Sequence, residues 1–460
     1  MKLVLLSGGS GKRLWPLSND VRSKQFLKML RNQHGEWESM VQRIWGQLQT
    51  YGQFDEVYLS TSKAQVDLIQ SQLGMDVPVI IEPESKDTFG AIALAAAYLH
   101  TACGVSNQEV IAVMPVDPYV DSPFFQHILQ LEGALADSGA QLALIGVEPT
   151  YPSTKYGYIV RDEEETCPGD GRGYQNVRSF KEKPTESEAR KLCEQQALWN
   201  CGVFAFQLGF LLGEMEKRGI PTDYELLLNR YESLTKISFD LEIVEKSQKT
   251  VVIPYKGYWR DLGTWNTLTE EMNARIVGRG YMDEECTNTH VINELGLPVV
   301  TIGIPNAVVA VSHDGILVAN KAKSHLVKEV VKEYEHRPMY EERRWGWYQV
   351  MNFQKMDNST ETLTKKLFIH AGKNLSYQYH LQRSEVWVVV AGEGDFVLDG
   401  RLQHIQPGDV LQIPQGAKHG IKAVSDMEII EVQMGAKLVE EDIVRLGMTW
   451  DEISKWTQHG

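Results

Sequence analysis

The chain has 460 residues, of which 43% are hydrophobic and 23% charged, which suits two or three globular domains of ordinary composition. Its formal net charge of -15 argues against nucleic acid or an anionic membrane as a partner. The five cysteines are scattered without a Cys-x-x-Cys pair, and no apolar run reaches membrane-spanning length, so we expect a cytoplasmic protein with reduced thiols.

The first informative stretch is a strand-like run, Leu3–Leu6, that opens directly into a glycine-rich turn. The turn consists of Gly8, Gly9, Ser10 and Gly11. Backbone N–H groups in such a turn converge on an anion, and Lys12, Arg13 and Lys24 can neutralise phosphate charge. The stretch therefore predicts a nucleotide-phosphate site. It matches neither the Walker A nor the dinucleotide pattern, so a tight turn with solvated cations is the alternative.

Strand-like and helical patterns then alternate to about residue 270. The predicted strands are Leu3–Leu6, Glu56–Ser60, Val77–Ile81, Glu109–Met114 and Gln141–Val147. The predicted helices include Glu36–Leu48 and Phe89–Cys103. This alternation predicts an α/β domain with a mostly parallel sheet covered on both faces, and ligands at the carboxyl ends of its strands.

Polar residues do follow these strand ends. Glu82 and Pro83 come after one strand, and Asp117 follows another. A carboxylate at the end of a buried strand, near a phosphate loop, is placed to hold Mg²⁺. The alternative for Asp117 is a turn residue that caps the next segment.

Four later clusters combine polar residues with aromatic ones. They are Tyr156–Ile159, Phe180–Pro184, Trp199–Phe204 and Trp259–Trp265. Adjacent charged and amide groups beside aromatic rings suit a sugar, because hydroxyls need paired donors and acceptors while ring faces cover the apolar side of the sugar.

These motifs, in this order, resemble a known family. The matching residues are Gly8–Ser18, Lys24–Phe26, Glu82-Pro83, Tyr156–Ile159, Glu182–Pro184, Trp199-Asn200 and Asp261-x-Gly263-x-Trp265. They resemble the bacterial mannose-1-phosphate guanylyltransferases of the long form, which carry a type II mannose-6-phosphate isomerase domain. The resemblance covers essentially the whole chain. It implies a Rossmann-like nucleotidyltransferase domain at 1–274, a short left-handed β-helix-like unit at 275–335 and a cupin jelly roll at 336–460.

The resemblance also implies a reaction. A phosphate oxygen of mannose 1-phosphate attacks the α-phosphorus of GTP, which yields GDP-mannose and pyrophosphate. Because the nucleophile is already anionic, positioning and charge neutralisation suffice without a general base. Arg13 and Lys24 would neutralise the triphosphate, and Asp117 and Asp261 would carry Mg²⁺.

The remaining transferase residues take binding roles in this family. The glycine turn, Lys12 and Glu82-Pro83 would face the nucleotide. The sugar phosphate would contact Tyr156, Gly157, Glu182, Lys183 and Asn200.

The chain departs from the family pattern at two places. Lys86-Asp87 stands where the family usually has Arg-Asn, and Pro118 stands where it has histidine. These departures keep two alternatives open. One is a nucleotidyltransferase for another sugar 1-phosphate, such as a fucose or heptose derivative; the other is a catalytically silent sugar-nucleotide-binding or assembly protein.

The pattern changes after Arg275, where short apolar pairs alternate with small polar residues up to Val331. This rhythm predicts a small β-helix-like or edge-sheet unit without chemistry of its own. The charged stretch Glu333–Arg344 indicates a linker or a helix end, and the chain beyond Trp345 is expected to be all-β. The sheet edges of this half could support a homodimer.

The C-terminal part has short strands in a jelly-roll rhythm. They are Leu375–His380, Val386–Ala391, Gly394–Leu398, Val410–Ile413 and Ile429–Gln433. The domain resembles a cupin whose second motif, Gly408 to His419, is nearly complete. Its first motif retains His380 and Glu385 but lacks the usual second histidine.

This altered motif leaves a candidate metal site. His380, Glu385 and His419, with Gln378 or Gln382, could bind Zn²⁺ or another divalent ion. His419 is followed by Gly420 where the isomerases usually carry arginine. Three alternatives stay open: an active isomerase, a metal-binding domain without that activity, and a degenerate domain that serves structure or assembly.

Overall fold

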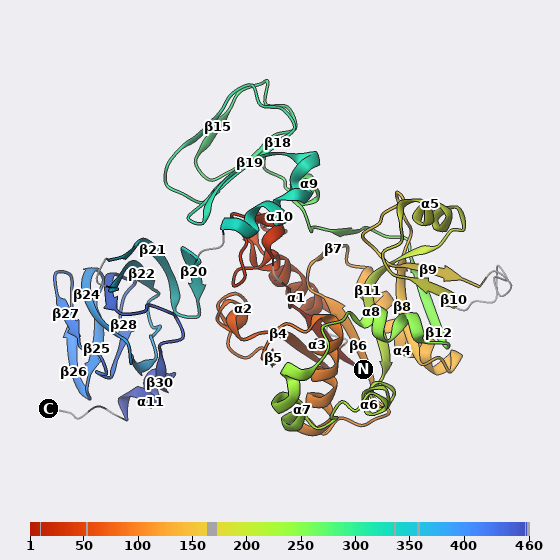
Figure 1. Ribbon diagram of the computed structural model, residues 1–460, viewed down its shortest axis with the longest axis horizontal. Helices are drawn as coiled ribbons and strands as arrows, with labels where there is room; N and C mark the ends of the chain where they lie inside the picture. The colour runs from red at the N-terminus through yellow and green to blue at the C-terminus, as the bar shows by residue number, and fades with distance from the viewer. Residues whose placement is uncertain are drawn as a thin grey trace.

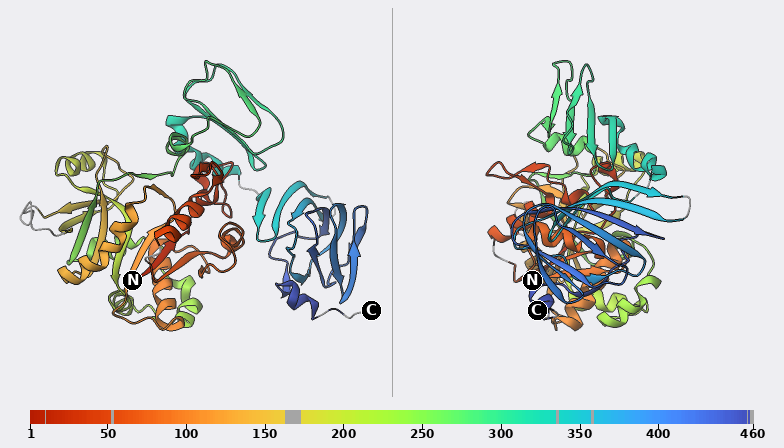
Figure 2. Two further views of the ribbon diagram at one scale, coloured as in Figure 1. Left: turned by 180° about the vertical axis from the view of Figure 1, so that it is seen from behind. Right: turned by 90° about the vertical axis from the view of Figure 1, so that its left-hand side faces the viewer.

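The structure is a computed structural model that describes residues 1–9, 11–51, 54–162, 173–334, 337–356, 359–455 and 457. Figure 1 shows an α/β body, a narrow group of strands drawn in green and teal that stands on it, and a β-sandwich drawn in blue at one end of the long axis. Seen along that axis, the sandwich lies in front of the body (Figure 2). No helix among the described residues is long and apolar enough to span a membrane.

The body is built on a nine-stranded sheet with the order β5-β4-β1-β6-β11-β8-β12-β10-β9. Its strands are β1 (Lys2–Leu6), β4 (Glu56–Ser62), β5 (Val79–Glu82), β6 (Val110–Pro115), β8 (Leu142–Val147), β9 (Tyr158–Arg161), β10 (Gln175–Lys181), β11 (Leu198–Gln207) and β12 (Thr250–Tyr255). Two small strand pairs flank it, β2 (Leu30–Arg31) with β3 (Trp37–Glu38) and β7 (Pro118–Val120) with β13 (Trp259–Asp261).

The prediction of a mostly parallel sheet is wrong for half of it. Strands β5, β4, β1 and β6 pair in parallel, as do β8 and β12. However, β11 runs antiparallel between β6 and β8, and β10 is antiparallel to both of its neighbours. A buried apolar run has the same pattern in either direction, so the sequence signal cannot distinguish the two.

Helices cover both faces of the sheet. They are α1 (Met40–Tyr51), α2 (Val66–Leu73), α3 (Asp87–Ala97), α4 (Phe124–Ser138), α5 (Glu186–Glu194), α6 (Leu208–Lys217), α7 (Tyr224–Arg230) and α8 (Phe239–Glu242). A further helix, α9 (Trp265–Glu271), belongs to a separate core that contains Leu14 and Val308. Successive β1 residues serve opposite faces, as the strand period requires: Leu3 and Leu5 belong to the core under α1 and α4, whereas Val4 belongs to the core under α3 and α6.

Both named helix predictions need adjusted ends. The predicted helix Glu36–Leu48 begins only at Met40, because Trp37 and Glu38 form β3 and the Ser39 hydroxyl then accepts a hydrogen bond from the Gln42 N–H. The predicted helix Phe89–Cys103 is α3, extended by one wider turn over Tyr98–Ala102.

Residues 275–334 form a stack of short strands. They are β14 (Ile276–Val277), β15 (Gly280–Met282), β16 (His290–Asn293), β17 (Val299–Thr301), β18 (Ala307–Ser312) and β19 (Gly315–Asn320), followed by α10 (Val327–Val330). Alternate strands pair in parallel, β14 with β16 and β18 on one side and β15 with β17 on the other. The chain thus passes alternately between two sheets, whose strands pair in parallel except that β19 runs antiparallel to β18.

The C-terminal part is a sandwich of two antiparallel sheets, with the orders β20-β21-β22-β29-β24-β27 and β26-β25-β28-β23-β30. Its elements are β20 (Tyr340–Arg343), β21 (Gly346–Lys355), β22 (Glu361–Ile369), β23 (Tyr377–Tyr379), β24 (Arg383–Ala391), β25 (Gly394–Leu398), β26 (Arg401–Ile405), β27 (Val410–Ile413), β28 (His419–Ala423), β29 (Met427–Gly435), β30 (Val444–Gly447) and α11 (Trp450–Ser454). The predicted linker Glu333–Arg344 is therefore partly wrong, because its end is already strand β20, paired with β21.

Ion pairs join the three parts. Arg22 of the body donates two hydrogen bonds to the Glu294 carboxylate of the strand stack, at 2.8 and 2.9 Å. Arg343 on β20 donates to Asp67 on α2 at 3.1 Å, and Lys28 pairs with Glu342 at 3.1 Å. Because the Arg22 guanidinium bonds both oxygens of the Glu294 carboxylate, this contact fixes the distance between the two groups and also their relative orientation.

We expect Arg22→Met to lower the free energy of unfolding by about 2 kcal/mol, because it leaves the half-buried Glu294 without its partner. Urea denaturation followed by tryptophan fluorescence measures this. Arg190→Met, which removes an exposed pair with Glu186 on α5, is the control and should leave the midpoint unchanged. Equal midpoints for both variants would contradict a structural role for Arg22.

Candidate functional site

The glycine turn lies at the carboxyl end of β1 and is held closed by its own neighbours. A Cβ at Gly11 would lie 2.5 Å from the backbone of Ser23 and Lys24, so only glycine permits this contact. Gln25 donates to the Ser7 carbonyl at 2.5 Å, which fixes the short helix Lys24–Phe26 against the end of β1. Ser10, a predicted nucleotide contact, lies outside the described residues.

Lys24 connects the two predicted metal carboxylates. Its ammonium lies 2.8 Å from Asp117 Oδ2 and 3.0 Å from Asp261 Oδ1. The ladder between β7 and β13 brings the two carboxylates together, because Asp261 pairs with Pro118, the residue after Asp117. The departure at Pro118 is therefore compatible with this pairing.

The charges of this group are strongly coupled. Burial alone would lower the pKa of Lys24, but Asp117 and Asp261 outweigh it and raise the pKa. Burial alone would raise the pKa of Asp261, but Lys24 and the exposed Arg13 keep it below its usual value. Two carboxylates and one ammonium leave one net negative charge, and hard carboxylate oxygens are the donors that Mg²⁺ prefers.

The structure places the other cation of the turn elsewhere. The Lys12 ammonium pairs with Asp20 at 3.0 Å and lines a separate cavity of about 420 Å³ that also touches Trp15 and Tyr334. The partner that the structure gives the Lys12 ammonium is thus Asp20, whereas Lys24 pairs with Asp117 and Asp261.

Glu82 lies beside the glycine turn, at the end of β5. A Cβ on Gly8 would be 3.2 Å from its Oε1, while the Tyr231 hydroxyl donates to its Oε2 at 3.1 Å. Burial raises the pKa of Glu82 to about 7, partly offset by Tyr231. Pro83 is exposed and lines a different cavity, described below. The contact with Tyr231 was not predicted, since no local pattern links β5 to residue 231.

The predicted sugar residues form one wall. The Asn200 N–H donates to the Gly157 carbonyl at 2.8 Å, and a Cβ at Gly157 would meet Glu182 Oε2 at 2.6 Å. Lys183 pairs with Glu182 at 2.8 Å. The ring of Tyr156 lies 4.9 Å from Trp199 and 5.6 Å from that of Trp259, which gives this wall an aromatic side.

Asp240 on α8 belongs to the same wall and was missed in the sequence. Its Oδ1 accepts a hydrogen bond from the Asn200 amide at 2.5 Å. Burial, together with the nearby Glu182, raises the pKa of Asp240 to about 6. Asp240 lies on a four-residue helix, which is too short to give a sequence pattern that would have identified Asp240 as part of the site.

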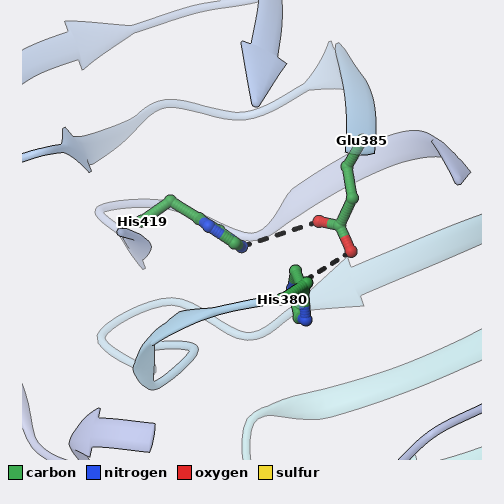
Figure 3. Close-up of side chains that lie close together, drawn as sticks. All are labelled: His380, Glu385 and His419. Carbon is green, nitrogen blue, oxygen red and sulfur yellow. Dashed lines mark ion pairs between the residues drawn. The ribbon is translucent and has the colours of Figure 1, made fainter. Parts of the chain in front are cut away.

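A second group of donors lies in the sandwich (Figure 3). His380 follows β23, Glu385 lies on β24 and His419 begins β28, and one donor atom from each lies within 4.8 Å of the others. The Nε2 atoms of His380 and His419 lie 3.2 and 3.6 Å from the Glu385 carboxylate.

Backbone carbonyls orient both rings. His380 Nδ1 donates to the Asp442 carbonyl at 2.5 Å and His419 Nδ1 to the Ala417 carbonyl at 3.0 Å. Both Nε2 atoms therefore present lone pairs to Glu385, and that of His419 is buried without a hydrogen-bond partner among the described residues. Burial lowers the pKa of each ring to about 4, so both are neutral at pH 7. Two neutral imidazoles and a carboxylate fit a divalent ion.

The two glutamines proposed as further ligands differ. Gln378 is buried and pairs directly with His419 across β23 and β28, so the two residues share a sheet face. Gln382 was a wrong prediction: its side chain is exposed because the chain turns outward after His380, and its N–H donates to Asp442.

Arg383 was not predicted as part of this group. Its Nε donates to Glu385 at 2.8 Å, and its Nη2 lies 3.4 Å from His380 Nε2. A bound cation would thus share Glu385 with a guanidinium. Arg383 also lines a cavity of about 740 Å³, together with Gln378 and Glu431 of the sandwich and with Pro83 and Asp67 of the body.

Comparison with known proteins agrees with this layout. Residues 2–276 match the protein family described as nucleotidyl transferase, and residues 328–448 match the family described as mannose-6-phosphate isomerase C-terminal. The xanthan biosynthesis protein XanB of Xanthomonas campestris pv. campestris is 29% identical, over 97% of this chain and 98% of that protein. The mannose-1-phosphate guanylyltransferase of Escherichia coli K12 is 28% identical, over 96% of this chain and 97% of that protein.

A solved structure described as mannose-1-phosphate geranyltransferase from Thermus thermophilus is also similar. It shares 28% identity and a TM-score of 0.59, and the match covers 73% of this chain and 99% of that chain. The chain therefore belongs to the nucleotidyl transferase family, in the long form that also carries a mannose-6-phosphate isomerase C-terminal domain.

Proposed function

We propose that this protein forms GDP-mannose and pyrophosphate from GTP and mannose 1-phosphate. The observation that carries the proposal is the contact of Lys24 with Asp117 and Asp261 beside the glycine turn. It combines a phosphate cradle, a cation and two carboxylates at one end of the sheet, as nucleotidyl transfer needs. The shared family and the name of the Escherichia coli relative support the same reaction.

The residues act by positioning and by charge. Arg13 and Lys24 neutralise the triphosphate, while the glycine turn offers backbone N–H groups to its oxygens. Asp117 and Asp261 would hold Mg²⁺, which supplies positive charge against the phosphate oxygens when bound. The attacking oxygen of the sugar phosphate is already anionic, so no side chain needs to remove a proton.

Glu82 supports the choice of guanine. Guanine presents N1–H and N2–H₂ donors on one edge, and an ionised carboxylate offers two acceptors to match them. Adenine presents an acceptor at N1, which the same carboxylate would repel. The proximity of Glu82 Oε1 to Gly8 supports this role, since the same turn is proposed to bind the phosphates.

The sugar phosphate binds along the wall formed by Tyr156, Gly157, Glu182, Lys183 and Asn200. Lys183 supplies charge for the phosphate, and the polar groups of Glu182 and Asn200 serve the hydroxyls. Neither departure from the family pattern removes a group from this wall. The Lys86 ammonium donates to the Glu232 carbonyl at 2.6 Å, and Pro118 pairs with Asp261.

The sandwich is a second site. We propose that His380, Glu385 and His419, with Gln378 as a weaker ligand, hold Zn²⁺ or another divalent ion. When bound, such an ion would polarise a sugar carbonyl or hydroxyl, which is the chemistry that interconversion of mannose 6-phosphate and fructose 6-phosphate requires. The buried Nε2 of His419, which has no hydrogen-bond partner among the described residues, supports a bound cation.

We further propose domain limits at 1–274, 275–335 and 336–460, with the middle unit a left-handed β-helix piece. The parallel pairing of alternate strands in that unit supports a coil. Because GTP is made and used in the cytoplasm, we place the enzyme there.

Purified protein with Mg²⁺, GTP and mannose 1-phosphate should release pyrophosphate faster than with any other pair in a panel of nucleoside triphosphates and sugar 1-phosphates. Asp117→Ala should lower the rate by at least ~100-fold, because it removes a carboxylate from the charged group. Asp137→Ala, at an exposed position on α4, should leave the rate unchanged. If no pair of nucleoside triphosphate and sugar 1-phosphate led to pyrophosphate release, the proposed nucleotidyltransferase activity would be refuted.

Glu82→Gln should raise KM for GTP by ~100-fold, because an amide presents one acceptor and one donor to the guanine edge. In the wild type, KM for GTP should rise as the pH falls below about 7, because Glu82 then gains a proton, and the variant should lose this dependence. The control is Glu84→Gln, whose carboxylate pairs with Lys86. A pH profile shared by wild type and Glu82→Gln would exclude Glu82 as the guanine acceptor.

Metal analysis of the purified protein should find roughly one tightly bound divalent ion per chain, and His419→Ala should lose it because one of three strong ligands is gone. His404→Ala removes an exposed histidine of the same sandwich and should keep the ion. A coupled assay measures the conversion of mannose 6-phosphate to fructose 6-phosphate, and its rate in His419→Ala should fall together with the metal content. If the wild-type protein neither contained bound metal nor catalysed this conversion, the proposed metal site would be refuted and the domain would have only a structural role.

A further inference from the structure

One segment of the chain touches both the nucleotide side and the sugar side of the transferase site. It runs from Tyr231 to Asp240 and bonds repeatedly to residues 82–89, which lead from the end of β5 into the start of α3. The contacts are Tyr231 hydroxyl to Glu82, Lys86 ammonium to the Glu232 carbonyl, Ile237 N–H to the Lys86 carbonyl, Phe89 N–H to the Ile237 carbonyl and Phe239 N–H to the Thr88 hydroxyl. The segment is therefore fixed to Glu82 and to the residues that follow it, up to the first turn of α3.

Phe239 anchors the far end of this segment. Its side chain is fully buried, with its ring 5.0 Å from Phe204 and 5.7 Å from Phe206. Both partners lie on β11, the strand that also carries Asn200. The position of Asp240 relative to Asn200 is thus set by packing as well as by their hydrogen bond.

Asn200 and Asp240 form a chain of oriented bonds. Asn200 Oδ1 accepts from the Gly202 N–H at 3.0 Å, and its Nδ2 donates to Asp240 Oδ1 at 2.5 Å. These partners define which end of the amide is oxygen. No other side chain among the described residues bonds to Asp240, so its Oδ2 keeps its acceptor capacity, and the residue is only partly buried.

The surroundings of Asp240 are those of a sugar site. Glu182 and Lys183 are close enough to act on it electrostatically, the first opposing and the second favouring its charge. Its pKa of about 6 leaves it ionised at neutral pH. An ionised carboxylate accepts strongly from hydroxyl groups, and a planar pair of acceptors distinguishes vicinal hydroxyls by their geometry.

We propose that Asp240 is a specificity-determining residue of the transferase, whose carboxylate accepts hydrogen bonds from the hydroxyls of the hexose 1-phosphate. Asn200 orients it, and Phe239 holds it in place. The inference rests on the proposed function, because it concerns the same sugar subsite. It assigns hexose selection to α8, outside the aromatic clusters that the sequence pattern emphasised.

The test is Asp240→Asn, which keeps the shape and the contact with Asn200 but removes the charge and one acceptor. KM for mannose 1-phosphate should rise by roughly 10-fold or more, with KM for GTP unchanged. A series of 2-, 3-, 4- and 6-deoxymannose 1-phosphates identifies the hydroxyl. The wild type should discriminate strongly against at least one of them, and Asp240→Asn should lose that discrimination.

Glu242→Gln is the matched control. Glu242 lies on the same short helix but bonds Arg218 and Lys246, away from the sugar wall, so its variant should keep the KM for sugar. If Asp240→Asn fails to fold, Asp240→Ser, which retains a short acceptor, replaces it. An unchanged sugar KM and deoxy-sugar profile in a folded Asp240 variant would overturn the inference. Absence of turnover in the wild type would instead overturn the proposed function.

Discussion

Two carboxylates that repel each other must lie close together at the end of the sheet, and this constraint organises the transferase site. Asp117 and Asp261 come from distant parts of the chain and meet because β7 pairs with β13. The Lys24 ammonium offsets their repulsion from a third segment, the short helix that closes the glycine turn. Loss of any one segment would leave uncompensated charge in a largely buried position.

The donor group of the sandwich differs from the transferase site, because its imidazole nitrogens are buried and uncharged. Carbonyls of Asp442 and Ala417 take the Nδ1 protons of His380 and His419, so the lone pairs face inward. Burial keeps both rings neutral. Arg383, which bonds Glu385 of this group, also lines the cavity between sandwich and body, and so do Arg343 and Asp67, whose contact joins the two parts.

Local patterns predicted the family, the α/β body and the sandwich, because apolar runs and glycine turns can be recognised within short stretches of sequence, and the order of the motifs can be followed along the chain. The comparisons confirmed the family. Strand direction in the sheet was mispredicted, because a buried strand such as β11 carries no directional signal. Gln382 was misplaced, because strand alternation ends at His380, where the chain turns. The partnership of Glu82 with Tyr231, and Asp240 itself, depend on tertiary pairing that no spacing encodes.

The segment from Tyr231 to Asp240 links Glu82 to Asp240. A shift of residues 86–89, which follow Glu82 closely in the chain, would displace Ile237 and Phe239, which are bonded to them, and hence the carboxylate beside Asn200. Coupling of this kind needs a contiguous set of packed and bonded groups, and Phe239, bonded to Thr88 and packed on β11, provides one. The same short segment therefore supports both Glu82 and Asp240, so the acceptors that we propose for the base and for the sugar belong to one connected structure.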